Sequence, residues 1–435
     1  MVNSRKEVLK LLNKTFKDNS YSNILLDSVL SDAEMSSQDK RFITVMYYGI
    51  IEKKITLDYI ISKYSSKKLS KLDPTILNIL RMGIYQLRYM DSVPDNAAVN
   101  ESVKLTRSFK VSSASGFVNA VLRHFIRDNK TAAWPTGKID AMSVKYSVDT
   151  GIIRKLISDY GDEFTNRFLE RAQLRPDVFI RHNTCSCSKD ELIKALEGFE
   201  ITQLSFPPAC MCVPGGDLTA TKAFDNGMFH VQDISSQLAC LILGLVRGEK
   251  VLDLCSAPGG KAFTMAQLME NTGSITAFDI HEQRAQLVQS GAARLGLTNI
   301  TARQGDALIH YDEFNGADKV LCDVPCSGLG VIRKKPEIRY KDTSEFEKLP
   351  EIQYAILKNG AAYLKPGGEL VYSTCTLNRA ENDDIIDKFL SENEDYEKAD
   401  FPVIPGMPEG IYKLTLGDDV FGSDGFFISK IKRKK

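Results

Sequence analysis

The stretch that decides the fold is Val251-Leu-Asp-Leu-Cys-Ser-Ala-Pro-Gly-Gly-Lys261. Its apolar first half predicts a strand, the Pro-Gly-Gly run predicts a tight turn, and residues 261–269 predict a helix. Gly259 and Gly260 lack side chains, so the backbone can bend sharply and a bound molecule can approach it closely. The first amides of the helix offer free donors there. The spacing fits neither GxGxxG nor a P-loop, so the turn alone indicates either a ligand site or an ordinary strand–helix connection.

Four later segments also predict strands that end in polar residues. Asp279 ends the first of them, 19 residues after Gly260, where α/β nucleotide-binding units place an acceptor for ribose hydroxyls. The other three strands end at Asp306, Asp323 and Cys375. Ligands in open α/β sheets bind at the carboxyl ends of the strands, so these residues should converge on one edge. Helix capping is the plainer alternative, and it accounts for one or two of these strand ends but not for all of them.

Six motifs in order carry a family resemblance: DLCSAPGGK, AFDIHEQR, QGDA, DVPCSG, STCT and DGFFISK. On these, residues from about 230 to 431 resemble the RNA cytosine-5 methyltransferases that use S-adenosylmethionine. The resemblance implies an α/β Rossmann-like S-adenosylmethionine-dependent methyltransferase domain over residues 226–435. It also implies cofactor contacts from Cys255, Ser256, Ala257, Pro258, Gly259, Gly260 and Lys261 on the methionine side, Asp279 on the ribose, Arg284 and Asp306 towards the adenine, and Asp323 between the cofactor and the target base.

Two cysteines carry the expected chemistry, with Lys261 and Asp323 beside them. Carbon 5 of cytosine is a poor nucleophile, so a thiolate must first add to carbon 6. Cys326 and Cys375 each follow a strand of the same predicted sheet and can face one pocket, where Lys261 would lower a thiol pKa. The residues alone leave open which cysteine attacks, or whether both are small buried hydrophobes. The resemblance implies that Cys375 attacks, that Cys326 assists product release and that Asp323 hydrogen-bonds the cytosine.

Length and composition indicate more than one domain. The 435 residues are 43% hydrophobic, which suggests two or three domains with sizeable cores. The net charge is zero, yet the first 140 residues hold 22 Lys/Arg against 14 Asp/Glu. That surplus favours a polyanionic partner, although a merely soluble helical surface would also carry it. Nine scattered cysteines favour a reducing cytoplasm, and neither a signal peptide nor a membrane span is written in the sequence.

A zinc site is the alternative use of four of the cysteines. Cys185-Ser-Cys187 and Cys210-Met-Cys212 could together supply four thiolates. The C-x-C spacing is tighter than in zinc fingers and no histidine lies at a supporting offset, so we expect no metal.

Residues 1–130 predict an all-α domain. Helical periodicity is clear at 41–51 and 75–87, the second with Asp73 at the N-cap and Pro74 at the first helical position. The segments LDPTILNILRMGIYQLRYM, DNAAVNESVKLTRSF and FVNAVLRHFIR are similar to the NusB-like RNA-binding fold. A NusB-like module before this catalytic domain resembles the Sun/Fmu group of 16S ribosomal RNA methyltransferases. Candidate phosphate contacts, each equally a solvated helix face, are Arg81, Arg88, Lys104, Arg107, Lys110 and Arg123.

Residues 140–225, after a linker, predict a small α+β subdomain that the resemblance makes RNA-contacting. Arg181-His-Asn183 corresponds to the family's Arg-Val-Asn, which makes Arg181 an RNA contact, although His182 departs from the pattern. The basic loop 331–340 offers Arg333, Lys334 and Lys335 on the pocket rim to hold RNA around a splayed-out base. Asp233 either caps the next helix or touches the cofactor, and we favour the cap.

The expected function is therefore methyl transfer from S-adenosylmethionine to carbon 5 of a cytosine in 16S ribosomal RNA, free or within a small-subunit precursor, by a monomeric cytoplasmic enzyme. The same chemistry on transfer RNA is the alternative within enzymes. An RNA-binding assembly factor with a relic methyltransferase domain is the alternative from another class.

Overall fold

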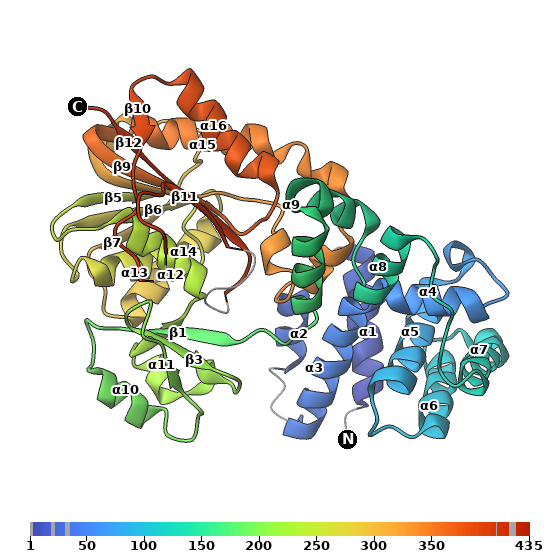
Figure 1. The fold of residues 1–435 in the computed structure, drawn as a ribbon. Coiled ribbons are helices and arrows are strands. Elements are labelled where there is room, and N and C mark those ends of the chain that lie inside the picture. The colour runs from blue at the N-terminus through green and yellow to red at the C-terminus, as the bar shows by residue number, and fades with distance from the viewer. Residues whose placement is uncertain (1–2, 19–21, 31–34, 406, 417–422) are drawn as a thin grey trace. The chain divides into compact units, whose positions relative to one another are not determined.

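The computed structural model describes residues 3–18, 22–30, 35–405, 407–416 and 423–435. The chain forms two compact units (Figure 1). The first is Met1–Gln173 with Lys334–Thr343, and the second is Leu174–Arg333 with Ser344–Lys435. The domain boundaries expected at 130, 140 and 225 stay predictions. Residues 140–173 belong with the helical unit, and only the later part of the expected subdomain belongs with the methyltransferase sheet.

The first unit is helical, as predicted. Asp73 caps α5 by accepting hydrogen bonds from the amides of Thr75 and Ile76, and Pro74 opens that helix. The apolar faces of α1 and α3–α7 form one buried cluster. The helices are α1 (Ser4–Asp18), α2 (Ser22–Leu30), α3 (Ser37–Glu52), α4 (Lys54–Tyr64), α5 (Pro74–Tyr89), α6 (Asp95–Ser108), α7 (Ser115–Arg127), α8 (Lys138–Tyr146) and α9 (Thr150–Arg171).

A segment from the second half of the chain completes this unit. The 3-10 helix η6 (Pro336–Tyr340) packs against α3. Arg339 on it is 1% exposed and donates to the carbonyl oxygens of Tyr146, at 3.0 Å, and Ala172. The ring of Tyr340 lies 6.3 Å from that of Phe16. The expected RNA-holding loop 331–340 thus also has a structural role, because its buried arginine needs these carbonyl partners.

A four-stranded antiparallel sheet begins the second unit, with strand order β2-β3-β1-β4. Ser188 and Glu191 form a capping box at the start of α10. The elements are β1 (Val178–His182), α10 (Lys189–Ala195), β2 (Thr202–Gln203), β3 (Cys210–Val213), α11 (Lys222–Asp225) and β4 (Phe229–Val231).

The main sheet has the order β10-β12-β9-β8-β5-β6-β7, with β11 paired to β12. The strands from β5 to β9 are parallel, and β12 returns antiparallel to β9. The strands are β5 (Lys250–Asp253), β6 (Ser274–Asp279), β7 (Ile300–Gln304), β8 (Ala317–Asp323), β9 (Leu364–Thr374), β10 (Tyr396–Lys398), β11 (Lys413–Leu416) and β12 (Phe426–Arg433). The chain order reverses between β5 and β8, the place where such sheets bind ligands.

Helices cover both faces of this sheet (Figure 1). Successive residues of β5 face opposite layers: Val251 packs with α12, α13 and α14, whereas Leu252 packs with α15 and α16. The helices are α12 (Ile234–Leu243), α13 (Gly260–Leu268), α14 (Glu282–Arg294), α15 (Leu349–Ala362) and α16 (Asp383–Glu392). The Rossmann-like prediction is confirmed. No helix among the described residues is long and apolar enough to cross a membrane.

Candidate active site

The turn between β5 and α13 forms one wall of a pocket. Gly259 has φ +105°, and a Cβ there would lie 2.5 Å from the ring of Phe263, so the turn requires glycine. The pocket has a volume of about 190 Å³. It is lined by Val231, Gln232, Asp233, Ser236, Asp253, Cys255, Ser256, Ala257, Pro258, Gly260, Lys261 and Asp323. The structure therefore brings together most of the residues expected on the methionine side of the cofactor.

Three lining side chains have buried polar atoms without a hydrogen-bond partner among the described residues. These atoms are both carboxylate oxygens of Asp253, Oγ of Ser256 and Nε2 of Gln232. Burial raises the pKa of Asp253 to about 7, helped by the charge of Asp323 and only partly offset by Lys261. Unpartnered buried groups beside a cavity fit a polar ligand, because such groups are otherwise hydrogen-bonded. Sequence reasoning missed Asp253 and Gln232; an acid inside an apolar strand was the available signal for the first.

Asp233 serves the capping role that we favoured. Its Oδ1 accepts hydrogen bonds from the Ser235 amide, at 3.0 Å, and from the Ser235 hydroxyl, at 2.7 Å. It begins α12 while also lining the pocket, so the cap and the pocket wall are the same residue.

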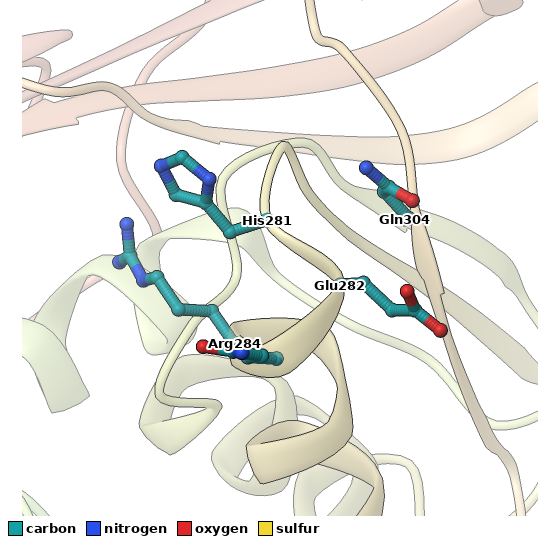
Figure 2. Close-up of a pocket in the computed structure, with 5 residues that line it drawn as sticks. His281, Glu282, Arg284 and Gln304 are labelled. Carbon is teal, nitrogen blue, oxygen red and sulfur yellow. The ribbon is translucent and has the colours of Figure 1, made fainter.

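A second pocket, of about 500 Å³, lies at the start of α14 and is lined by His281, Glu282, Gln283, Arg284 and Gln304. Figure 2 shows the side chains of His281 and Arg284 on one side of the helix start and those of Glu282 and Gln304 on the other.

Asp279, predicted to bind ribose, pairs with Arg284, which lines this second pocket, although Asp279 itself lines neither pocket. Asp279 is 4% exposed, and its Oδ1 accepts from the His281 amide at 3.0 Å. Arg284 lies 3.5 Å from the other carboxylate oxygen of Asp279 and donates to the Ala257 carbonyl oxygen at 3.1 Å. Arg284 thus ties the β6 end to the β5 turn. Asp306 follows β7, where its Oδ1 accepts from the Leu308 amide, and it lines neither pocket.

Lys261 and Asp323 form an ion pair at the first pocket. The lysine Nζ donates to Oδ2 of Asp323 at 2.7 Å, and the Ser373 hydroxyl donates to Oδ1 at 2.7 Å. Burial opposes the charge on Lys261, but the attraction and hydrogen bond of Asp323 outweigh it, so the pKa of Lys261 is raised. The thiol of Cys375 adds to this effect, which places Lys261 in its electrostatic reach. The lysine therefore stays cationic beside the cysteines.

The sulfur atoms of Cys326 and Cys375 lie 3.3 Å apart. Both residues are half-buried, and the separation is well beyond the roughly 2.05 Å of a disulfide. The hydrogen bond to Cys375 and burial, in that order, raise the pKa of Cys326 well above its usual range. Cys326 thus tends to keep its proton, and either sulfur can be the donor of the hydrogen bond between them. The structure brings the two predicted thiols to one place.

Arg181 and Arg333, which we expected to contact RNA, are used inside the second unit. Arg181 is 2% exposed; its Nε donates to Gln267 Oε1 at 3.0 Å and its Nη1 to the Pro208 carbonyl oxygen at 3.1 Å. These bonds join β1 to α13. Arg333 donates to the Ser423 carbonyl oxygen at 3.1 Å and pairs with Asp424 at 3.4 Å. A buried guanidinium such as that of Arg181 must find such partners, and the RNA contacts of both residues stay predictions.

Lys334 and Lys335, the other two expected RNA contacts, are exposed and belong to the segment that joins the helical unit. Arg81, a candidate phosphate contact, is buried and bound to Asp58 at 2.6 Å and 2.8 Å. Across the described ranges, no group of three or more His, Cys, Asp or Glu side chains is arranged to hold a metal ion.

Residues 240–432 match the family described as 16S rRNA methyltransferase RsmB/F, and residues 2–127 match the NusB family. The chain is 34% identical to the Bacillus subtilis (strain 168) probable ribosomal RNA small subunit methyltransferase B, over 98% of both chains. It is 32% identical to the protein of that name from Synechocystis sp., over the whole of both. The crystal structure of PH0851 is similar in fold, with a TM-score of 0.84, 24% identity and coverage of 100% of this chain and 99% of that one.

Proposed function

The chain belongs to the RsmB/F family of 16S ribosomal RNA methyltransferases and carries a NusB-family domain, and from this premise we propose that it methylates carbon 5 of a cytosine in 16S ribosomal RNA, using S-adenosylmethionine and a covalent bond from Cys375 to the base. The observation that carries the proposal is the pair of thiols 3.3 Å apart, within the electrostatic reach of Lys261.

The β5 turn and its surroundings fit S-adenosylmethionine. The cofactor has an amino group and a carboxylate at one end, and the pocket at the turn offers unpartnered Asp253, Ser256 and Gln232. We propose that Cys255 to Lys261 hold the methionine part, with Gly260 opening α13. At the carboxyl end of β6, Asp279 would bind the ribose hydroxyls. Arg284 on α14 and Asp306 after β7 would lie towards the adenine. When bound, the cofactor supplies a methyl group on a positively charged sulfur.

Cys375 is the proposed nucleophile. Its thiolate would add to carbon 6 of the cytosine, which places electron density on carbon 5 and makes that carbon able to take a methyl group. The nearby cation of Lys261 favours the thiolate form of Cys375. A base then removes the proton from carbon 5, the sulfur–carbon bond breaks, and the aromatic ring is restored. Cys326, which retains its proton, would assist this release.

Asp323 is the proposed contact to the base. Its carboxylate is held from both sides, by Lys261 and by Ser373. A carboxylate in this position can hydrogen-bond the cytosine edge and share a proton with the ring nitrogen as electrons move into the ring. The two hydrogen bonds fix its orientation, so the base would meet an acceptor that is already in place.

The helical unit is the proposed RNA-binding module. Lys104, Arg107, Lys110 and Arg123 are exposed on it, as are Lys334 and Lys335 on the inserted segment. Exposed cations gain affinity for RNA by releasing counterions from phosphates. The target cytosine must leave its stack to reach the thiols, which single-stranded or loop RNA permits at the lowest cost.

Two cysteine variants test the covalent mechanism. We expect Cys375→Ala to lose methyl transfer to 16S ribosomal RNA, and Cys326→Ala to accumulate a protein–RNA adduct that survives denaturant. Cys185→Ser, at an exposed cysteine, is the matched control and should keep wild-type turnover. Substantial turnover by Cys375→Ala would show that the nucleophile is assigned wrongly. Mapping 5-methylcytosine in total RNA with and without the protein identifies the substrate position.

A further inference from the structure

Glu381 is a buried acid beneath the two cysteine loops. Its side chain is fully buried, and the described hydrogen bonds to its carboxylate all come from neutral donors. Oε2 accepts from the Ser327 amide at 2.9 Å and from Gln353 Nε2 at 2.9 Å. Oε1 accepts from the Ser327 hydroxyl at 2.5 Å and from Asn378 Nδ2 at 2.8 Å. Four donors thus converge on one carboxylate.

These donors come from three separate elements. Ser327 directly follows Cys326, and Asn378 lies in the loop that begins at Cys375. Gln353 belongs to α15 and also donates to the carbonyl oxygen of Pro325, on the other side of Cys326, at 2.9 Å. We call Glu381, Ser327, Gln353 and Asn378 the carboxylate clamp. It fixes the backbone on both sides of Cys326 and joins it to the loop after Cys375.

Other contacts keep the same two loops together. The hydroxyls of Ser327 and Thr376 lie 2.7 Å apart. The Gly330 amide donates to the Cys375 carbonyl oxygen at 3.0 Å, and the Gly425 amide donates to the Gly330 carbonyl oxygen at 3.0 Å. The thiol separation is therefore set by the packing of the loops. The carboxylate clamp is the buried polar centre of that packing.

The charges around the thiols are unequal. Glu381 and Asp323 both contribute to the raised pKa of Cys326, behind the hydrogen bond between the two thiols, burial and the charge of Cys375. Lys261 is the cation that interacts with Cys375. The buried phenol of Tyr372, also near this group, has a pKa raised first by burial and stays neutral. The negative charge of Glu381 near Cys326 and the positive charge of Lys261 near Cys375 both favour the arrangement in which Cys326 keeps its proton and Cys375 is the thiolate.

We propose that Glu381 is a positioning residue that holds the two cysteine loops against each other, so that Cys326 keeps its proton and Cys375 is the thiol that attacks. This inference rests on the proposed function. It explains why two thiols at one site take different roles, which neither their spacing in the sequence nor their mutual contact decides.

The carboxylate form is needed because all four groups around it are donors. An ionised glutamate offers acceptors only, whereas glutamine replaces one oxygen by an NH₂ donor. Glu381→Gln therefore keeps the side-chain volume, removes the charge and sets an NH₂ donor against two of the four donors, because each carboxylate oxygen accepts two hydrogen bonds. Glu381→Asp keeps the charge but shortens the reach by one methylene, so it should recover part of the function.

The test combines turnover with thiol reactivity in the full-length protein. For Glu381→Gln we expect kcat for methylation of 16S ribosomal RNA to fall about 100-fold, as for a misplaced catalytic group, with little change in KM. In the wild type, iodoacetamide at rising pH should alkylate Cys375 before Cys326, and Glu381→Gln should lose this order. Glu394→Gln, at an exposed acid, is the control and should match the wild type.

Ser327→Ala covers the case in which Glu381→Gln does not fold. It removes one hydroxyl donor and leaves the charge, so a folded variant should show a smaller loss of kcat and a weaker preference for Cys375. The inference would be overturned if a folded Glu381→Gln kept the wild-type kcat and alkylation order. If Glu381→Gln does not fold, the same result for Ser327→Ala would overturn it. Either result would leave the expected loss of activity in Cys375→Ala unaffected. Turnover by Cys375→Ala would instead refute the proposed function.

Discussion

Replacement of Asp253 by asparagine should make the protein more stable at high pH. Asp253 has no exposed surface and no hydrogen-bond partner among the described residues, and its pKa is raised by burial to about 7 from an ordinary 3.8. The native state therefore keeps a proton that the unfolded chain has already lost. The contribution of Asp253 to the free energy of unfolding is therefore fully present below pH 3.8, decreases as the pH rises, and is lost above about pH 7.

The size of the effect follows from the two pKa values. Their difference corresponds to about 4 kcal/mol of lost stability at pH 8, of which roughly 3 kcal/mol develops between pH 5 and pH 8. An asparagine at 253 carries no charge to bury, so this pH-dependent loss should vanish. For a unit of this size, 3 kcal/mol corresponds to roughly 5–10 °C in melting temperature.

The assay is thermal unfolding of the wild type and Asp253→Asn without cofactor, at intervals from pH 5 to pH 8. The desolvation cost of the amide does not vary with pH. The prediction is therefore tested by how the difference in melting temperature between Asp253→Asn and the wild type changes with pH. Asp400→Asn, at an exposed acid, should run parallel to the wild type. A difference between wild type and Asp253→Asn that stays constant over this range would refute the reasoning.

Two further substitutions test structural assignments. Arg181→Ala should destabilise the protein by about 2–3 kcal/mol, because it leaves the Pro208 carbonyl oxygen and Gln267 unpaired, whereas the RNA affinity of the folded protein should not change. Thermal melting and RNA titration test this, with Arg175→Ala, at an exposed arginine, as the control. A loss of RNA affinity without a loss of stability would support the RNA-contact hypothesis instead. Gly330→Ala should abolish turnover or folding, because its Cβ would lie 1.8 Å from the Gly425 carbonyl oxygen; Gly116→Ala, with open space around it, should be neutral, and an active Gly330→Ala would contradict the close packing of the two loops.

The motif residues could be placed from the sequence because the order of parallel strands determines which residues lie at the same edge of the sheet. Parallel strands that end in polar residues bring those residues to one edge, so the meeting of Lys261, Asp323, Cys326 and Cys375 follows once the strand pattern is recognised. Capping was equally local: Asp73 and Ser188 act through amides two or three residues away.

The sequence is least informative about residues whose partners are distant along the chain. Arg339 and Arg181 look like exposed basic residues, yet they bond to carbonyl oxygens and side chains that only the fold brings near. Glu381 lies in the polar run NRAENDD, and nothing in that run indicates that it is buried. Local composition cannot distinguish a solvated charge from one held by several convergent donors.

The insertion of residues 334–343 into the helical unit also bears on the order of events during synthesis. The first 173 residues leave the ribosome long before Arg339, because the whole of 174–333 is translated in between. Until then the carbonyl oxygens of Tyr146 and Ala172 lack the guanidinium that bonds them in the finished protein. The nascent amino-terminal unit therefore completes its interior only after the larger part of the second unit, residues 174–333, has been made, which couples the two units in biosynthesis.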